Sequence, residues 1–384
     1  MSGIDPFLVM DVQDRALELE AKGRRIIHME IGQPDFPAPT QVAAAAIEAI
    51  RSRRLEYTAS IGIPQLRQAI SDYYRRQLGI SVAPSRIVVT AGASGGFLLV
   101  LGALLNPGDE VLMADPSYPC NRNFVRLFGG VPSMIPVDEK QLYQPLDSDI
   151  RARWGPRTRG VLIATPSNPT GSVIPEEELR AIIESARNRG GFVIVDEIYQ
   201  GLAYDDAVNL SALAFAEDVF VVNSFSKYFN MTGWRLGWVV APASHVRGIE
   251  KLAQNVFICP SAPAQYGALA AFQPDTLAVL EDRRLEFQRR RDYLVPALRK
   301  LGFRIPVTPQ GAFYVYAGCE NFAADSLEFA LRVLHEAGVA IAPGADFGVN
   351  QARQHVRFAY TRALEDLKEG VESIDRMLRR GRND

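Results

Sequence analysis

Short apolar runs recur through the middle of the chain and alternate with amphipathic stretches. The runs are aliphatic or β-branched and lack strict polar alternation, which is typical of strands covered on both faces. The alternation of such strands with helices predicts a mostly parallel α/β sheet, whose ligands bind at the carboxyl ends of the strands. The runs are RIVVTAG from Arg86, EVLMADP from Glu110, GVLIATP from Gly160, FVIVDEIY from Phe192, VFVVNSF from Val219 and LGWVVAP from Leu236.

The clearest helix follows Pro175, in the segment PEEELRAIIESARNRGG. Proline opens the segment, glutamates occupy the first turn and a glycine pair ends it, as helix termini favour. Leu179, Ile182 and Ile183 have the spacing of one apolar face. We therefore expect this helix to pack on the sheet.

The pattern changes after about residue 275. A long charged helix is predicted over 276–303, followed by the strand signals GAFYVYAG, VAIAPG and HVRFAY and by an amphipathic helix from Ala363. We expect a large domain over 41–275 and a smaller α+β domain built from 1–40 and 276–384. Within the long helix, the run Arg289 to Arg291 lies among acidic residues, and we expect it to form a solvated face.

Composition and charge exclude several classes of function. The 384 residues include 42 Lys and Arg against 44 Asp and Glu, a net charge of −2, which argues against nucleic-acid binding by bulk electrostatics. The three cysteines form no CxxC pair and the four histidines form no ligand cluster, so we expect neither disulfides nor a metal site. Acidic residues interrupt the N-terminal segment and no apolar run reaches about 18 residues, so neither a signal peptide nor a transmembrane span is expected. We expect a cytoplasmic protein.

The segment with the most chemical content is VVNSFSKYFNMTGWRLGWVV, residues 221–240. Lys227 follows a buried strand among apolar and hydroxyl residues, where desolvation lowers a lysine pKa and leaves a nucleophilic amine. Ser224, Ser226 and Arg235 supply hydroxyl donors and a fixed cation for a phosphate. Taken alone, the segment is more typical of a lysine that reaches solvent from the end of a strand.

Other polar residues also follow predicted strands. Asp196 ends a buried strand, where a carboxylate is costly unless it is paired, although it is also compatible with a helix cap. Asn168 lies in TPSNPTG, which by itself favours a plain turn, and Tyr118 lies in DPSYPCN, where its ring is available for stacking. The small residues of VVTAGASGGF let backbone N–H groups approach an anion at a helix N-terminus.

Taken together and in this order, these segments resemble the class I/II aminotransferases, which are pyridoxal-phosphate-dependent enzymes of fold type I. The resemblance covers nearly the whole chain and rests on IGQPDFPAP, EYTASIG with Tyr57, TAGAS, DPSYP, SNPTG, DEIY, SFSK with Arg235, PQGAFYV and HVRFAY. It implies an α/β fold like that of aspartate aminotransferase, with a mostly parallel seven-stranded sheet flanked by helices and a smaller α+β domain made of both chain ends. It also implies a homodimer with shared active sites.

The resemblance implies a role for each matching residue. Lys227 resembles the lysine that forms a Schiff base with the aldehyde of pyridoxal 5'-phosphate, and Asp196 matches the carboxylate that pairs with its pyridine nitrogen. Tyr199 and Asn168 match the donors to its phenolic oxygen. The other matches are Tyr118 on the ring, Ser224, Ser226, Arg235 and the backbone of Ala93 and Ser94 at the phosphate, Tyr57 from the neighbouring subunit, and Gly32 and Arg357 at the substrate, with Arg357 holding its α-carboxylate.

The implied activity is transfer of an amino group from an L-amino acid to a 2-oxo acid by a ping-pong mechanism. Lys227 would serve as general base and acid while the cofactor accepts electrons from the substrate Cα. Some relatives that prefer dicarboxylates have a lysine where this chain has Ser94, so a neutral aliphatic or aromatic substrate is expected, although Arg24 or Arg122 could still supply a cation.

Two alternatives remain open at this point. One is another pyridoxal-phosphate reaction on the same fold, such as that of a C–S lyase or a decarboxylase, since the residues at the base of the site are shared. The other is a cofactor-binding regulator without catalysis. A requirement for added 2-oxo acid, which returns as an amino acid, distinguishes transamination from both.

Overall fold

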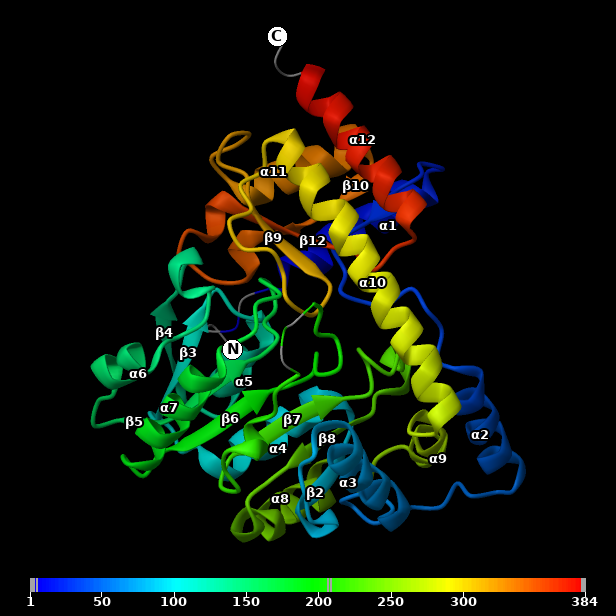
Figure 1. Cartoon of the computed structure of the whole chain (residues 1–384), viewed down its shortest axis with the longest axis vertical. Coiled ribbons are helices and arrows are strands. Elements are labelled where there is room, and N and C mark those ends of the chain that lie inside the picture. Colours follow the sequence, from blue (N-terminus) through cyan, green and yellow to red (C-terminus); the bar gives the residue numbers. More distant parts are fainter. Residues whose placement is uncertain (1–3, 5, 206, 208, 381–384) are drawn as a thin grey trace.

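A mostly parallel seven-stranded sheet forms the centre of the molecule, in the order β2-β8-β7-β6-β5-β3-β4 (Figure 1). The computed structural model describes residue 4, residues 6–205, residue 207 and residues 209–380. Strand β8 runs antiparallel to both of its neighbours, β2 and β7, and the other neighbouring strands of this sheet are parallel to each other. The strands are β2 (Ile87–Thr90), β3 (Glu110–Asp115), β4 (Val131–Pro136), β5 (Thr158–Ala164), β6 (Phe192–Asp196), β7 (Phe220–Ser224) and β8 (Gly237–Val240).

Six of these strands coincide with the apolar runs seen in the sequence, whereas β4 does not. Its sequence is VPSMIP, it lies at the edge of the sheet, and most of its residues are partly or fully exposed. Proline is tolerated at such an edge because an edge strand leaves one side of its backbone unpaired. A half-exposed strand with two prolines gives no apolar run, which is why the sequence pattern did not indicate it.

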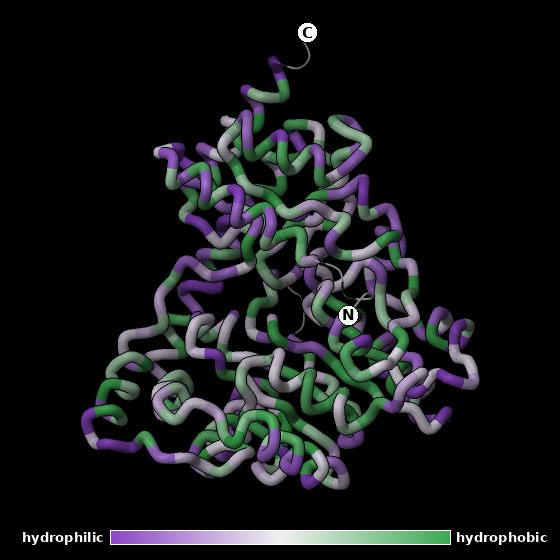
Figure 2. The backbone as a smooth tube through the Cα atoms, turned by 180° about the vertical axis from the view of Figure 1, so that it is seen from behind, coloured by the Kyte–Doolittle hydropathy of each residue, from purple (hydrophilic) through white to green (hydrophobic). Residues whose placement is uncertain are grey.

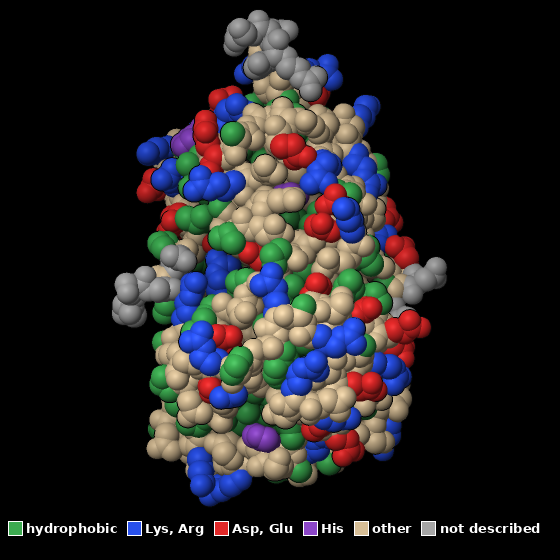
Figure 3. All heavy atoms as spheres, turned by 90° about the vertical axis from the view of Figure 1, so that its left-hand side faces the viewer, with side chains coloured by type: hydrophobic (Ala, Val, Ile, Leu, Met, Phe, Trp, Pro, Cys, Tyr) green, Lys and Arg blue, Asp and Glu red, His purple; other side chains and the backbone are tan. Residues whose placement is uncertain are grey.

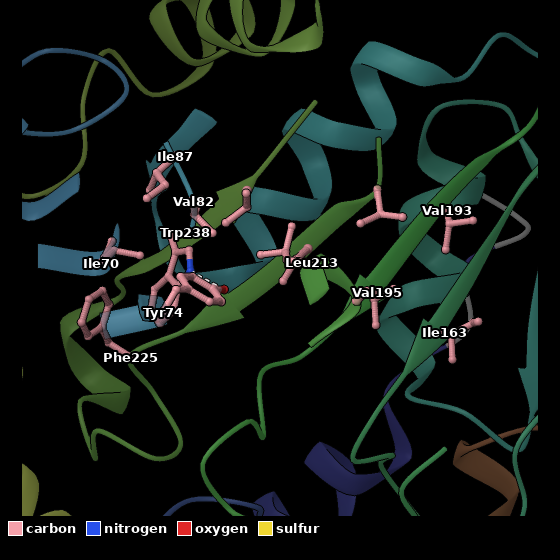
Figure 4. Packing of buried hydrophobic residues seen from close by; sticks show 14 of the residues in the cluster. Ile70, Tyr74, Val82, Ile87, Ile163, Val193, Val195, Leu213, Phe225 and Trp238 are labelled. Carbon is pink, nitrogen blue, oxygen red and sulfur yellow. Dashed lines mark hydrogen bonds between the residues drawn. The ribbon is translucent and has the colours of Figure 1, made fainter. Parts of the chain in front are cut away.

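Helices cover both faces of the sheet. The side chains of neighbouring strand residues alternate between two cores, so that Val88 packs with Phe97 of α4 while Val89 packs on the other side with Ile70 and Tyr74 of α3. Figure 4 shows part of this second core, in which Ile70, Tyr74 and Trp238 lie together. The α-helices of the described chain, in the large and the smaller part together, are α1 (Leu8–Ala21), α2 (Thr40–Arg51), α3 (Pro64–Leu78), α4 (Gly92–Leu104), α5 (Pro119–Leu127), α6 (Asp147–Arg153), α7 (Glu176–Arg187), α8 (Ala243–Val256), α9 (Ala262–Ala271), α10 (Pro274–Leu301), α11 (Ser326–Arg332) and α12 (Leu364–Arg380).

The helix expected after Pro175 is α7, and its apolar face is buried against the sheet as the spacing indicated. The hydropathy of the chain follows this layering, with hydrophobic positions concentrated in the interior segments and hydrophilic ones at the periphery (Figure 2). None of the helices in the described part of the chain is long and apolar enough to span a membrane. On the face seen in Figure 3, Lys and Arg side chains are interspersed with Asp and Glu, in keeping with the small net charge.

Both ends of the chain build a second, smaller α+β part. Strand β1 (Ile27–His28) pairs in parallel with β10 (Val339–Ala340), and α1 lies in the same part of the molecule as α11 and α12 (Figure 1). A three-stranded antiparallel sheet joins β11 (Ala342–Pro343), β12 (His355–Ala359) and β9 (Tyr314–Gly318). The expected fold class, a mostly parallel seven-stranded α/β sheet with a smaller α+β part, is confirmed. The proposed boundaries at 40/41 and 275/276 stay a prediction, and residues 1–3 and 381–384 lie outside the described part.

The expectation of a solvated face at Arg289 to Arg291 was wrong for two of the three residues. Arg290 and Arg291 are each only 3% exposed, whereas Arg289 faces solvent. Arg290 pairs with Asp35 at 2.8 Å and Arg291 pairs with Asp205 at 2.7 Å. Distant segments supply these carboxylates and cover the helix, and the local sequence of α10 contains no sign of them.

Candidate active site

A cavity of about 720 Å³ lies at the carboxyl edge of the large sheet, between that sheet and the smaller part. Every site residue expected from the sequence lines it, with the exception of Tyr57, whose side chain is 82% exposed elsewhere. The lining residues that were expected are Gly32, Ala93, Ser94, Tyr118, Asn168, Asp196, Tyr199, Ser224, Ser226, Lys227, Arg235 and Arg357. Their individual roles stay predictions.

The topology of the sheet explains why distant motifs meet here. Strands β6 and β7 are parallel neighbours, so Asp196 and Ser224 end at the same edge. Strand β8 is antiparallel and therefore begins at this edge, with Gly237 opposite Ser224, which brings the preceding Arg235 to the cavity. Gly237 also pairs with Thr90 at the end of β2, close to the start of α4.

Lys227 lies in the cavity with its amine close to the N-terminal segment. Its Nζ donates a hydrogen bond to the backbone oxygen of Gly32 at 2.7 Å. Burial lowers the pKa of Lys227 to about 8, and the positive charges of Arg357 and Arg235 act in the same direction against the opposing effect of Asp196. The amine therefore loses its proton far more readily than an exposed lysine does, which favours nucleophilic and proton-transfer chemistry.

Asp196 is a buried carboxylate with weak neutral partners. It is 3% exposed, and it accepts hydrogen bonds from Asn121 Nδ2 at 3.2 Å and from the backbone N–H of Ile198 at 3.3 Å. Burial raises the pKa of Asp196 to about 6 in spite of these donors. A cationic ring nitrogen placed against it would offset the cost of that burial.

The phosphate-binding residues expected from the sequence form a close-packed group. Gly92 has a φ of +71°, and a Cβ there would lie 2.6 Å from Arg235 Nη2. A Cβ at Gly237 would lie 2.8 Å from the backbone nitrogen of Ala93. The absence of side chains at both glycines lets Arg235 and β8 approach the N-terminus of α4, and Ser224 and Ser226 line the same cavity.

This donor set fits pyridoxal phosphate. A helix N-terminus with an arginine and two serines suits a phosphate, a buried carboxylate suits a protonated pyridine nitrogen, and an amine of lowered pKa suits an aldehyde. All of these groups line one cavity.

Arg357 forms the opposite wall of the cavity from β12. Its Nη1 donates to Asn168 Oδ1 at 2.9 Å, and its Nη2 donates to the backbone oxygen of Glu30. The guanidinium lies 4.2 Å from the ring centroid of Tyr314, and it is 3% exposed. Its Nε has no hydrogen-bond partner among the described residues, so the group keeps a donor for a ligand such as a carboxylate.

Two tyrosines shape the same wall. The hydroxyls of Tyr199 and Tyr314 lie 2.8 Å apart and share a hydrogen bond. Burial holds the pKa of Tyr199 well above its ordinary value, so it is a neutral donor. A Cβ at Gly32 would lie 1.7 Å from the Tyr314 hydroxyl, which explains why glycine stands at this position.

Sequence reasoning missed several residues of the cavity. Tyr314 was seen only as part of a strand signal. Behind the lining residues, the donor to Asp196 was missed as well: it is Asn121, three residues after Tyr118. The residues contributed by the N-terminal segment gave no signal, because an apolar side chain on a short helix is usually part of a core. The missed lining residues include Phe7, Val9, Met10, Gln13, Phe97 and Phe124.

Neither of the two arginines suggested as an additional cation is among the residues that line the cavity. Arg24 donates to the backbone oxygen of His335 at 2.7 Å, and Arg122 donates to that of Asp346 at 2.7 Å. Ser94 does line the cavity, in the position where a lysine was expected for a dicarboxylate substrate.

Known proteins resemble this chain over nearly its whole length. A valine–pyruvate aminotransferase of Mycobacterium tuberculosis is 40% identical, with 97% of this chain and 96% of that protein covered. An aspartate/prephenate aminotransferase of Thermus thermophilus is 34% identical, with 99% and 98% covered. The crystal structure of an aminotransferase from Mycobacterium tuberculosis superposes with a TM-score of 0.96 at 40% identity, covering 99% of this chain and 98% of that one.

The aspartate aminotransferase of Thermus thermophilus with maleate superposes with a TM-score of 0.93 at 33% identity, covering 98% of each chain. The family model for aminotransferase class I and II matches residues 24–374. These similarities support transamination over the lyase, decarboxylase and regulator alternatives. The chain therefore belongs to the family of class I and II aminotransferases, a pyridoxal-phosphate-dependent family, and it is an aminotransferase.

Proposed function

We propose that this chain binds pyridoxal 5'-phosphate and transfers the amino group of a neutral L-amino acid to a 2-oxo acid. The observation that carries the proposal is the convergence of Lys227, Asp196 and Arg357 on one cavity. Lys227 and Asp196 belong to the edge of the large sheet and Arg357 belongs to the opposite wall. This arrangement holds the cofactor at one side and the substrate carboxylate at the other.

The cofactor, when bound, withdraws electrons from the substrate Cα. Arg357 orients the substrate by gripping its α-carboxylate with a planar fork of donors. Lys227 then takes the proton from Cα, because its lowered pKa makes its free amine more available than that of an exposed lysine. Tyr199 and Asn168 supply neutral donors beside these groups, and Ser224, Ser226 and Arg235 hold the phosphate. The oxo acid product leaves before the second oxo acid binds, which makes the kinetics ping-pong.

A neutral substrate is supported by the walls of the cavity. Phe7, Val9 and Met10 line it from the N-terminal segment, and Ser94 stands where a cation would serve a second carboxylate. A valine–pyruvate aminotransferase is among the relatives, which agrees with an apolar side chain, whereas other relatives are named for aspartate. The apolar walls and Ser94 favour an amino acid with an apolar side chain over aspartate.

The test is a half-reaction screen of the cofactor-loaded enzyme with single amino acids, followed by the change in cofactor absorbance. Valine, leucine, alanine and phenylalanine should react with a kcat/KM at least about tenfold above that of aspartate, since one missing charge partner is worth about 1.4 kcal/mol or more. Ser94→Lys should raise the value for aspartate and leave that for valine nearly unchanged. A wild-type preference for aspartate would overturn the substrate assignment.

We also propose a homodimer, in which Tyr57 reaches the phosphate of the neighbouring subunit. Tyr57 follows a run of apolar side chains that are about half exposed, Ile47, Ile50 and Leu55. The exposed Val256 and Ile258 lie close to this run, because Gln265 bridges Thr58 and the backbone oxygen of Pro260. A second copy of the chain would cover this surface. Sedimentation should show a dimer, and Leu55→Glu should dissociate it; a fully active monomer would contradict the proposal.

A cytoplasmic location is proposed as well. Its support is that the three cysteines, Cys120, Cys259 and Cys319, are all free thiols in the structure, as a reducing compartment allows. Fractionation of the source cells tests it.

A further inference from the structure

Residues 28–32, called the strap below, contact two of the cations that line the active site, Arg357 and Lys227. The backbone oxygen of Glu30 accepts a hydrogen bond from Arg357 Nη2, and that of Gly32 accepts one from Lys227 Nζ at 2.7 Å. The strap is itself tied down at its other carbonyls. The oxygen of Met29 accepts from the backbone N–H of Ala359 at 2.7 Å, and that of Ile31 accepts from Thr361 Oγ1 at 3.2 Å.

The side chain of Glu30 has no role in the chemistry described so far, yet it is completely buried. Its Oε1 lies 2.7 Å from His28 Nδ1, and its Oε2 has no hydrogen-bond partner among the described residues. A buried carboxylate is costly unless a cation pairs with it. His28 is the neighbour that can supply this charge, and it does so only while its ring is protonated.

The surroundings of His28 favour its protonated form. Its Nε2 lies 3.2 Å from Glu20 Oε1 of α1, so the ring stands between two carboxylates. The hydrogen bond to Glu30 is the largest cause of a raised pKa for His28, and burial opposes it. The raised pKa keeps His28 charged to a higher pH than a free histidine.

Other charged groups close to His28 come from neighbouring elements. Arg362 Nε donates to the backbone oxygen of His28 at 3.4 Å, and Arg25 and Asp366 line a polar groove together with the ring. Arg25 and Asp366 pair with each other at 2.9 Å, and both are exposed. The carboxylates that contact the ring directly are therefore those of Glu20 and Glu30.

We propose that His28 and Glu30 are positioning residues for Arg357, which set the affinity for the substrate α-carboxylate without touching it. The protonated ring holds the Glu30 carboxylate, and the Glu30 carbonyl holds Nη2 of the guanidinium. When His28 loses its proton, the Glu30 carboxylate is left buried without a cation. The strap then shifts to reduce the cost of that buried charge, and Arg357 is held less well. The inference rests on the proposed function, in which Arg357 binds that carboxylate.

The sign of the pH dependence follows from this order of events. The pair is intact below the raised pKa of His28 and is lost as the pH rises through it, so KM for both substrates should increase on the alkaline side. Lys227 also has a shifted pKa in the cofactor-free chain, lowered to about 8, but it acts on kcat through the proton at Cα. Separate profiles of kcat and KM therefore distinguish the two groups.

The experiment compares His28→Asn, Glu30→Gln and the matched control Glu20→Gln in the full-length, cofactor-loaded enzyme. KM and kcat are measured across the pH range, and pyruvate binding is measured by calorimetry. Below about pH 6.5, where the raised pKa keeps His28 charged, His28→Asn should raise KM and the Kd for pyruvate about tenfold, change kcat less than about threefold and abolish the alkaline rise in KM. Glu20→Gln removes the exposed carboxylate on the other side of the same ring, and it should leave KM within about twofold.

Glu30→Gln keeps the shape of the side chain and removes the buried charge, so its KM should stay low and nearly independent of pH. The double variant should bind substrate more tightly than His28→Asn alone, because no unpaired carboxylate remains. These two variants test the idea even if His28→Asn does not fold. An alkaline rise in KM that persists in Glu30→Gln, or an equal effect of Glu20→Gln, would overturn it. An unchanged KM in Arg357→Lys would instead show that the carboxylate assignment itself is wrong.

Discussion

The two sides of the active-site cavity are held together in different ways. At the sheet edge, Asp196 and Ser224 end adjacent parallel strands, and the ladder of the sheet fixes their positions. At the opposite wall, Arg357 is held by Asn168 and by the carbonyl of Glu30, partners that are 189 and 327 residues away in the chain. The first side depends on secondary structure and the second on a few long-range contacts. Substitutions at the sheet edge should therefore remove chemistry or cofactor binding, whereas those at the wall should weaken substrate binding.

The largest effect is expected at Lys227. Lys227→Ala removes the amine that we propose takes the proton from Cα, and kcat should fall by at least about 10²- to 10⁴-fold, the range for loss of one acid–base group. The absorbance band of the bound cofactor should shift as well, because its covalent partner is gone. Stopped-flow half-reactions check both. The structural control is thermal unfolding, which should change little since Lys227 contributes one hydrogen bond; wild-type turnover would contradict the role.

The next largest effect is expected at Asp196. Asp196→Asn keeps the shape and removes the charge, so the affinity for pyridoxal phosphate should fall by about 10²- to 10³-fold, the scale for breaking a buried charge pair. Equilibrium dialysis of the cofactor measures this loss. The matched control is the adjacent Glu197→Gln. Glu197 is completely buried, and burial raises its pKa to about 8, so it carries a proton at neutral pH and glutamine resembles it.

Glu197 also gives a prediction for stability. Because its pKa is raised in the folded chain, the folded state holds a proton that the unfolded state loses above about pH 4.5. Stability due to this group is therefore greatest below that pH and falls, by about 1.4 kcal/mol per pH unit, until about pH 8. Glu197→Gln should flatten this slope in thermal unfolding of the cofactor-free chain. Parallel curves for the two proteins would show that Glu197 is ionised throughout.

The contrast between the two sides also explains what could be predicted from the sequence. The sheet edge was predictable, because its polar residues lie at or just after the end of an apolar run that forms a buried strand, as Asp196 does at the end of β6. The number of strands was expected only from the family resemblance, since the half-exposed β4 gives no apolar run. The role of Lys227 was also expected only from that resemblance. For the opposite wall, which carries Arg357, individual residues could be predicted only from that resemblance. Nothing in the local sequence shows that Tyr314 meets Gly32, or that Arg290 pairs with Asp35.

A smaller effect, on binding, is expected from Arg357→Lys. Lysine keeps the positive charge but cannot hold Asn168, the Glu30 carbonyl and a carboxylate at once, because its donors do not form a planar fork. KM for both the amino acid and the oxo acid should rise by about 10- to 100-fold, with a smaller change in kcat. Steady-state kinetics with each substrate varied in turn measures this. A loss confined to kcat would mean that Arg357 acts on the chemical step and not on binding.

The smallest effect is expected at the tyrosine that was missed. Tyr314→Phe removes the hydroxyl bonded to Tyr199, and a neutral hydrogen bond contributes about 0.5–1.5 kcal/mol, so kcat/KM should fall by about 2- to 10-fold. Tyr316, two residues further on the same strand, provides the matched control. Its buried hydroxyl has no partner among the described residues and its ring stacks on His355 at 4.5 Å, so Tyr316→Phe should leave kcat/KM unchanged and should not lower the melting temperature. Equal losses of kcat/KM in the two variants would show that only the packing of this wall matters to activity. A loss only in Tyr314→Phe would show that the Tyr314 hydroxyl orients Tyr199, and that the wall contributes to chemistry as well as to binding.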